Sequence, residues 1–121
     1  MKYMLLIYHD ETAWNDHSAA EHQQIYGEYR ALIEKLQSSG KYLDGDQLQP
    51  RSTASVVRVR DGKPLVTDGP FAETREQIGG FFMIDASNID EAVSIAGQIP
   101  SARTGAIEIR PVVAAARANG E

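Results

Sequence analysis

The chain has 121 residues, a formal net charge of −5 at pH 7 and no cysteine. This length suits a single domain, and the lack of cysteine excludes disulfides, thiol catalysis and thiolate metal sites. The negative charge argues against nonspecific binding to nucleic acid or anionic membranes, because both attract a positive field. No apolar stretch approaches the roughly 20 residues of a membrane span, and Met1–Tyr8 is too short for a signal peptide. We therefore expect a cytoplasmic protein that binds neither nucleic acid nor membrane.

The first predicted elements are a buried strand and an amphipathic helix. Tyr3–Tyr8 is continuously apolar, which is typical of a strand buried on both faces, and the polar segment His9–His17 is expected to be a loop. Ser18 and Glu21 form a capping-box pattern that predicts the start of a helix, and Gly40 is placed to end it. The apolar residues that recur at helical spacing between them are Ile25, Tyr29, Leu32, Ile33 and Leu36.

The middle of the chain predicts a hairpin. Lys41–Leu48 is interpreted as a short strand that Pro50 ends. Ser55–Arg60 alternates in polarity, Pro64–Thr67 returns as a second strand, and Asp61-Gly62 between them is a two-residue hairpin turn signal.

The last third predicts a strand, a helix and a strand. Phe81–Ile84 follows two glycines and is apolar, so it is expected to be a strand. Asn88 and Glu91 repeat the capping-box pattern at the start of a second helix, which Gly97 stops. Ala106–Val113 is the last expected strand.

These elements follow the ferredoxin-like βαββαβ plan with an additional β-hairpin, an α+β fold in which both helices cover one face of the sheet. The other face should then be open. The first strand offers apolar residues to both faces, since Tyr3, Leu5 and Ile7 alternate with Met4, Leu6 and Tyr8. Such an apolar face should not stay in water, so we expect a homodimer in which two sheets pack together.

A distinctive motif lies within Val66–Phe82. Asp68-Gly69-Pro70-Phe71, followed by Ala72-Glu73-Thr74-Arg75-Glu76, resembles the signature of the DGPF branch of the YCII-related family. The opening strand, the hairpin and the closing strand also resemble that family. We therefore divide the chain into a YCII-related domain over residues 1–113 and a C-terminal tail over residues 114–121.

The resemblance implies a ferredoxin-like subunit that forms a dimeric α+β barrel, and it implies no particular activity. Members of the branch often accompany extracytoplasmic-function sigma factors, which implies a regulatory or stress setting. The related YCII branch carries a proposed His–Asp pair with its histidine near the start of the first helix. His22 lies at a comparable place, and Asp44 or Asp46 is the candidate partner.

The loop Asp68–Phe71 has the turn chemistry of a rigid bend, with Phe71 expected to anchor it in the core. It is either a structural turn alone or a lip that presents Glu73 and Arg75 to a cavity. Arg75 could bind a carboxylate or phosphate through two N–H groups, and Glu73 could orient it or act as a base. The alternative for both residues is a solvated loop or an ion pair across the dimer interface.

Basic and tyrosine side chains are expected on the open face of the sheet. Arg58, together with Arg51 and Arg60, is predicted to lie there with Tyr3 and Tyr8 and to hold a small anion, the alternative being plain exposure to solvent. Trp14 is expected to cover the core or the dimer interface. The histidines lack metal-ligand spacing and Gly79-Gly80 does not match a dinucleotide fingerprint, so we expect neither a metal nor a cofactor.

Two functions fit this sequence. The first is a small dimeric binding or accessory protein whose ligand is a small anion or whose partner is a regulatory protein, with Asp68, Phe71, Glu73, Arg75, Arg58 and Tyr8 as the candidate binding residues. The second is an enzyme that uses acid–base chemistry on a small anionic substrate in the cleft near the same loop, with His22, Asp46 and Glu73 as the candidate catalytic residues.

Overall fold

The apolar run near the start of the chain forms a central strand of a four-stranded sheet. The computed structural model describes residues 1–114. β1 (Lys2–His9) lies between β5 (Gln77–Asp85) and β6 (Ala106–Pro111), and β2 (Tyr42–Gln47) pairs with the outer side of β5. All neighbouring strands are antiparallel. The order β2-β5-β1-β6 with crossover helices confirms the predicted ferredoxin-like α+β fold.

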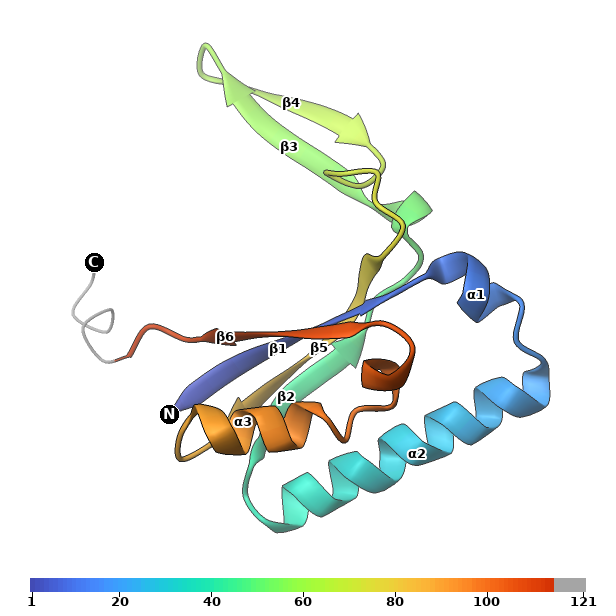
Figure 1. The fold of residues 1–121 in the computed structure, drawn as a ribbon. Helices are drawn as coiled ribbons and strands as arrows, with labels where there is room; N and C mark the ends of the chain where they lie inside the picture. Colours follow the sequence, from blue (N-terminus) through green and yellow to red (C-terminus); the bar gives the residue numbers. More distant parts are fainter. Residues whose placement is uncertain (115–121) are drawn as a thin grey trace.

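The helices lie together on one side of this sheet (Figure 1). α2 (Ala19–Ser38) begins with the predicted capping box, in which the Ser18 hydroxyl accepts from the Glu21 N–H and the Glu21 carboxylate accepts from the Ser18 N–H. α3 (Ile89–Ala96) crosses back between β5 and β6. Within residues 1–114, none of the helices combines the length and the apolar character that a membrane crossing requires.

The core lies between the sheet and these helices. The residues of the covered sheet face are almost fully buried, and those of α2, α3 and the turn after α3 pack against them. The buried core residues are Tyr3, Leu5, Ile7, Leu32, Leu36, Phe82, Ile84, Ala86, Ala92, Ile95, Ala96 and Ile99. The alternate residues of β1 and β5 face the other side, where no helix of the described chain covers them.

A short helix replaces the loop that we expected over residues 9–17. β1 continues through His9, and α1 (Glu11–Asn15) follows it directly. The Asp10 carboxylate caps this helix by accepting from the N–H groups of Thr12 and Ala13. Asp is a favoured N-cap residue, so Asp10 was a local signal for a helix start, but the polar character of the segment led to the prediction of a loop.

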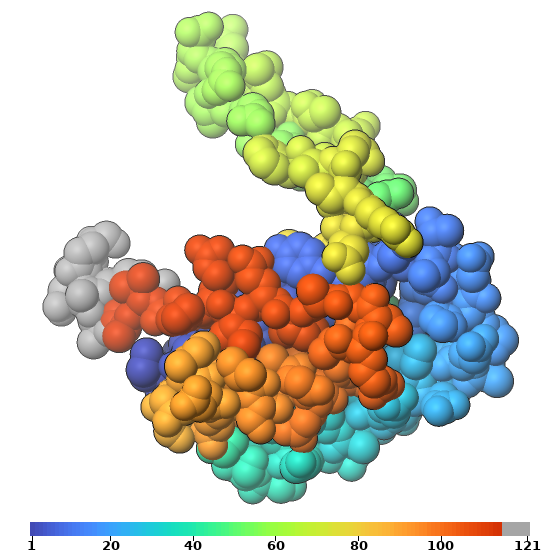
Figure 2. All heavy atoms as spheres, in the orientation of Figure 1, coloured from blue at the N-terminus to red at the C-terminus, as the bar shows by residue number. Residues whose placement is uncertain are grey.

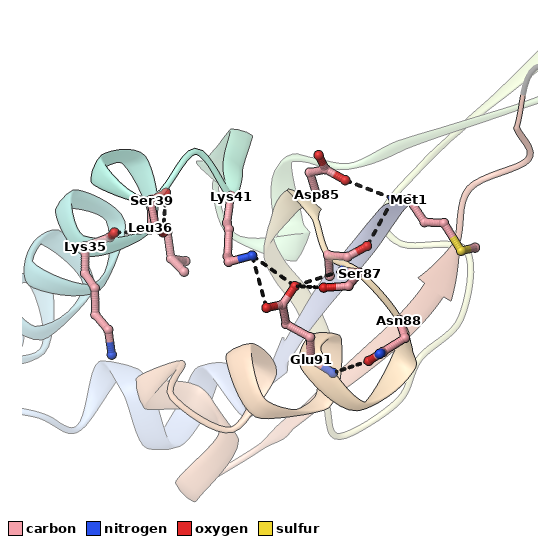
Figure 3. Close-up of polar contacts among 10 residues, drawn as sticks. Met1, Lys35, Leu36, Ser39, Lys41, Asp85, Ser87, Asn88 and Glu91 are labelled. Atoms are coloured by element: carbon pink, nitrogen blue, oxygen red, sulfur yellow. Dashed lines mark hydrogen bonds and ion pairs between the residues drawn. The ribbon is translucent and has the colours of Figure 1, made fainter.

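The start of α3 is held by a small polar cluster (Figure 3). The Asn88 side chain accepts from the Glu91 N–H at 3.0 Å. The Glu91 carboxylate does not return to the Asn88 N–H as in a full capping box; it accepts from the Ser87 N–H at 2.8 Å and pairs with Lys41 at 3.0 Å. The helix end is therefore tied to the chain entering β2.

The predicted hairpin forms a separate two-stranded sheet. β3 (Ser55–Arg60) pairs with β4 (Lys63–Asp68) through the turn at Asp61 and Gly62, whose φ values are 52° and 75°. Positive φ at both positions is the requirement of a type I′ turn, which Asp-Gly meets at low cost. The hairpin projects away from the body on the side of the sheet opposite α2 and α3 (Figures 1 and 2).

Candidate functional site

A cavity of about 240 Å³ lies between the sheet and the N-terminal part of α2. Strands β1, β2 and β5 form its floor, while α1, α2 and the turn Pro100–Arg103 form its walls. Ring side chains dominate the lining, namely His9, Trp14, Tyr26, Tyr29, Tyr42 and Phe82. Two isoleucines, Ile7 and Ile33, add aliphatic surface. Concave, mostly apolar sites of this kind are typical of small-molecule binding.

The α1 helix brings Trp14 to the cavity. Its indole ring stacks on the His22 ring, with ring centroids 4.1 Å apart and planes 18° apart, and meets the Tyr26 ring edge-on at 5.6 Å. His22, Tyr26 and Tyr29 lie at helical spacing on one face of α2, so their rings follow one another along the helix. The three-ring contact fixes the wall of the cavity.

His22 does not meet a carboxylate in the described part of the chain. Its Nε2 donates to the Trp14 carbonyl oxygen at 2.8 Å. Because a carbonyl can only accept, this bond places a proton on Nε2. No hydrogen bond joins His22 to Asp46, and Asp44 accepts from the N–H of the next residue, Gly45. The structure therefore does not bring together the His–Asp pair that the family resemblance implied.

The polar groups of the cavity are hydroxyls, an amide and an imidazole. The Tyr29 hydroxyl is hydrogen-bonded to the Ser101 hydroxyl at 2.7 Å, and the Gln47 amide donates to the Tyr26 hydroxyl at 3.2 Å. Burial raises the pKa of Tyr29, so this phenol stays neutral at physiological pH. No group of residues 1–114 hydrogen-bonds the His9 ring, which leaves its nitrogens free for a bound molecule.

The cavity has no basic side chain in its described lining. The one acidic residue among the lining residues is Asp46, which pairs with Phe81, whereas its neighbour Gly45 pairs with Phe82 of the covered face. Because side chains alternate along a strand, the Asp46 carboxylate belongs to the opposite face and its backbone lines the cavity. No carboxylate, lysine or arginine side chain of the described lining therefore faces the interior.

The DGPF motif lies outside this cavity. Asp68 ends β4 and Gly69 follows it with a φ of 100°, which confirms the bend expected there. The prediction that Phe71 anchors the loop in the core is wrong, because 76% of its surface is exposed. Its ring lies instead beneath the Arg58 guanidinium, whose central carbon is 5.2 Å from the ring centroid. An aromatic next to Pro in this loop thus covers the hairpin base.

The loop after this motif is tied to α1 and not to a ligand cleft of its own. The Arg75 Nε donates to the Asp10 carboxylate at 3.1 Å, while most of the Arg75 side chain is exposed. This bond, followed by the N–H groups of α1, lowers the pKa of Asp10. Glu73 is exposed, and within residues 1–114 its side chain has no hydrogen bond or ion pair. Arg75, Glu73 and His22 therefore do not converge on one site.

The expected basic patch on the open sheet face does not form. Arg58 and Arg60 belong to the separate hairpin, and Tyr3 is buried under the helices with 3% of its surface exposed. Tyr8 does lie on the open side, where its hydroxyl donates to Glu108 at 2.8 Å, and this hydrogen bond raises the pKa of Tyr8. A one-residue β-bulge between Ile7 and Tyr8 shifts the pairing there.

A second, wider hollow lies between the DGPF loop and the segment that precedes β3. Tyr8, Pro70, Phe71 and Thr74 line it, and Arg51 is its one cation within the described chain. The Arg51 guanidinium donates to the Thr74 carbonyl at 3.1 Å and lies 3.6 Å from the Glu11 carboxylate, so its charge is already paired. The hollow thus lacks a free cation for an anionic ligand.

The rings of the first cavity were missed as site residues. His9 and Trp14 lie in a segment that we expected to be a loop, and Tyr26 was not assigned to the apolar stripe of its helix. The available signal was the spacing of His22, Tyr26 and Tyr29, which marks a second, aromatic stripe beside the core-facing one.

The chain was compared with known families and proteins. The model of the YCII-related domain matches residues 1–116. An uncharacterized protein of Rhizobium meliloti (strain 1021) is 36% identical over 114 residues, which cover 93% of this chain and 92% of the relative. The match spans the sheet, the helices, the hairpin and the aromatic cavity together. The chain therefore belongs to the YCII-related family.

Proposed function

We propose that this protein binds a small neutral ring compound in the aromatic cavity. The single observation that carries the proposal is a cavity walled by rings, into which no lysine, arginine or carboxylate side chain of the described lining points, with the hydroxyls of Tyr26 and Tyr29 and the His9 imidazole at its surface. Aromatic walls favour a planar ligand through stacked and edge-to-face contacts. The few polar groups would orient one hydroxyl, amide or carbonyl of the ligand.

The cavity volume limits the size of the ligand. About 240 Å³ is near the low end of small-molecule sites, which usually start at about 300 Å³. A single ring or a fused pair of rings is therefore the expected size. An anion is disfavoured, because a buried charge without a partner loses its hydration and gains nothing in return.

We further propose that the binding unit is a homodimer. Met4 and Leu6 of β1 lie beside Met83 and Phe81 of β5 on the sheet face that no helix of residues 1–114 covers. Two copies that pack these faces together would remove an apolar surface from water, which is the main driving force of such association. The resemblance to the DGPF branch adds a regulatory setting beside sigma factors, and this setting would place the protein in the cytoplasm.

The experiment is a thermal-shift comparison of four single-ring or two-ring probes. Phenol and indole are neutral, benzoate is an anion and benzamidine is a cation. At about 100 times its dissociation constant, a ligand stabilises the native state by about 2.7 kcal/mol, which raises the melting temperature by roughly 4–8 °C for a domain of this size. We expect the neutral probes to raise it, and the charged probes to leave it unchanged.

Two variants test whether the thermal shift comes from binding in the aromatic cavity. Trp14→Ala removes one wall and should abolish the shift, whereas Val93→Ala changes an exposed residue of α3 that does not line the cavity and should keep it. A shift by benzoate that Trp14→Ala leaves intact would contradict the proposal. That result would favour the alternative, acid–base chemistry on an anion at the DGPF loop with Glu73, Arg75 and His22.

A further inference from the structure

Apart from the contact of Arg58 with Phe71 at its base, the β3–β4 hairpin packs little on the rest of the described chain. Its strands pair with each other and with no strand of the main sheet. Figure 2 shows it standing clear of the body as a thin arm. A single two-stranded hairpin is at best marginally stable in water, because neither face buries enough surface to offset the cost of ordering the chain. The hairpin therefore needs a second surface to pack on.

The two faces of the arm differ in chemistry. The pairs Val57–Val66 and Val59–Pro64 share one face, and the three valines expose 59%, 64% and 62% of their surface in the order Val57, Val66, Val59. The pairs Arg58–Leu65 and Arg60–Lys63 share the other face. The arm is thus an amphipathic ribbon whose apolar face has no cover within residues 1–114.

The position of the arm indicates what covers it. The arm rises on the side of the main sheet opposite α2 and α3, which is the side of the uncovered Met4, Leu6, Phe81 and Met83 (Figure 1). A second copy seated on that open face would lie beside the arm of the first. Under two-fold symmetry each copy would then receive the arm of the other, and both unpartnered surfaces would be covered in one closed assembly.

The charge distribution favours the same occupant. The arm carries three basic and two acidic residues, while the chain as a whole has a net charge of −5. The body of another copy is therefore acidic, and Asp44 and Asp46 lie in β2 at one edge of its sheet. The arm and the body of a second copy therefore have net charges of opposite sign, which favours their approach.

We propose that residues Ser55–Asp68 form a dimerisation arm that packs its valine face on a second copy of this chain. The inference rests on the homodimer of the proposed function and assigns to the hairpin a role within it. Pairing of open sheet faces alone leaves the arm exposed, whereas arm exchange covers it. The two arrangements differ in whether the valines contribute to affinity.

Sedimentation equilibrium of the full chain tests the arm. The double variant Val57→Lys with Val59→Lys places two charges on the apolar face, and we expect the dimer dissociation constant to rise at least about 100-fold, since each buried unpaired charge costs more than a tenfold step. Leu65→Lys is the matched control, because it changes an exposed apolar residue of the same hairpin on the opposite face. It should leave the constant within about threefold. Circular dichroism checks that both variants fold.

Crosslinking gives an independent readout, because the natural chain has no cysteine. Val59→Cys labelled with benzophenone maleimide should give covalent dimers on illumination, with adducts on peptides of the second copy, and Leu65→Cys should give far fewer. A stable dimer that the valine variants do not weaken would overturn the arm and leave the homodimer standing. A lone subunit at micromolar concentration would overturn both, while ligand binding in the cavity would be judged by the thermal shifts alone.

Discussion

At the scale of single residues, the shape of the cavity depends on a contact between a glycine and a histidine. A Cβ placed on Gly79 would lie 2.5 Å from the His9 Nε2, far inside the van der Waals distance. The His9 ring thus occupies the space that a side chain at position 79 would fill. Gly80 beside it approaches the Asp46 carbonyl of β2 in the same way. These glycines of β5 let a ring and a neighbouring strand come close.

Gly79→Ala should therefore alter binding more than stability. The methyl group would push the His9 ring, a flexible side chain, and change the free imidazole at the cavity surface. We expect at least a tenfold weaker response to phenol, about 1.4 kcal/mol of binding free energy, with the free energy of unfolding changed by less than about 1 kcal/mol. Titration calorimetry and urea unfolding measure the two quantities. Gly27→Ala is the control, because no atom lies within 4 Å of a Cβ there.

At the scale of elements, one buried amide holds the loop that follows the DGPF motif. Gln77 at the start of β5 is 9% exposed, and its amide nitrogen donates to the Ala72 and Thr74 carbonyls at 3.0 and 2.8 Å and to the Thr74 hydroxyl at 2.9 Å. The Arg51 guanidinium reaches the same Thr74 carbonyl. Polar contacts therefore hold this loop against β5. Phe71 does not hold it, because its side chain does not enter the core.

Replacing this amide should loosen the loop. Gln77→Leu keeps the approximate volume, leaves the Ala72 carbonyl without the Gln77 donor and leaves the Thr74 carbonyl with Arg51 alone, which costs about 1–3 kcal/mol. We expect the free energy of unfolding in urea to fall by that amount and trypsin to cleave faster after Arg75 in the folded protein. Glu73→Gln, whose side chain is exposed, is the matched control and should change neither. Equal cleavage rates for both variants would contradict the role assigned to Gln77.

The same scale explains which elements the sequence predicts. The helix starts at Ser18 and Asn88 and the hairpin turn at Asp61-Gly62 were confirmed, because each depends on local backbone chemistry that a few residues specify. The α1 helix was missed because five residues give no hydrophobic period to detect. The exposed position of Phe71 was missed because hydrophobicity predicts burial on average and does not identify the individual apolar residues that stay exposed.

The candidate site was harder to predict than the fold for a related reason. The sequence favours the charged residues around the DGPF motif as a site, because Arg and Glu are residue types that bind anions and transfer protons. The cavity is instead made by rings from α1, α2, β1, β2 and β5, which meet only after the sheet and α2 have packed. Such a site has no contiguous motif. Among its described lining residues, the aromatic stripe on α2 is the part of the cavity that a local sequence pattern could predict.

At the scale of the whole molecule, the two faces of the main sheet carry different features. The helix side of the sheet holds both the core and the aromatic cavity, while the open side and the arm carry the apolar surface that lacks cover. A ligand and a second copy would therefore use opposite faces of the same strands. Because β1 and β5 contribute side chains to both faces, ligand binding and dimerisation would each contact both strands. Dimer variants of the arm leave the cavity residues untouched, so the two functions can be separated by mutation.

The stability of the molecule should fall at acid pH through the starts of α1, α2 and α3. Asp10 accepts from Arg75 and caps α1, Glu21 completes the capping box of α2, and Glu91 accepts from Ser87 and Lys41 beside the start of α3. In each case these hydrogen bonds hold the pKa of the carboxyl below its ordinary value. Carboxylates at helix starts also interact favourably with the helix dipole. The unfolded chain has the ordinary values, 3.8 for Asp and 4.5 for Glu. The unfolded state therefore takes up protons first as the pH falls.

The sign of the effect follows from this order of protonation. Above about pH 5 both states are ionised and the contribution is fully present, and it is lost as the pH falls through the ordinary and then the folded pKa values. We expect the urea midpoint to be level from pH 7 to about pH 5 and to drop below it. Glu91→Gln should lie below the natural chain at pH 7 and approach it at about pH 3, because protonation removes the same charge. Glu34→Gln, an exposed change on α2, is the control, and its urea midpoint should differ from that of the natural chain by the same amount at every pH in this range. If the midpoint of Glu91→Gln also runs parallel to that of the natural chain, the charge of Glu91 does not stabilise the start of α3.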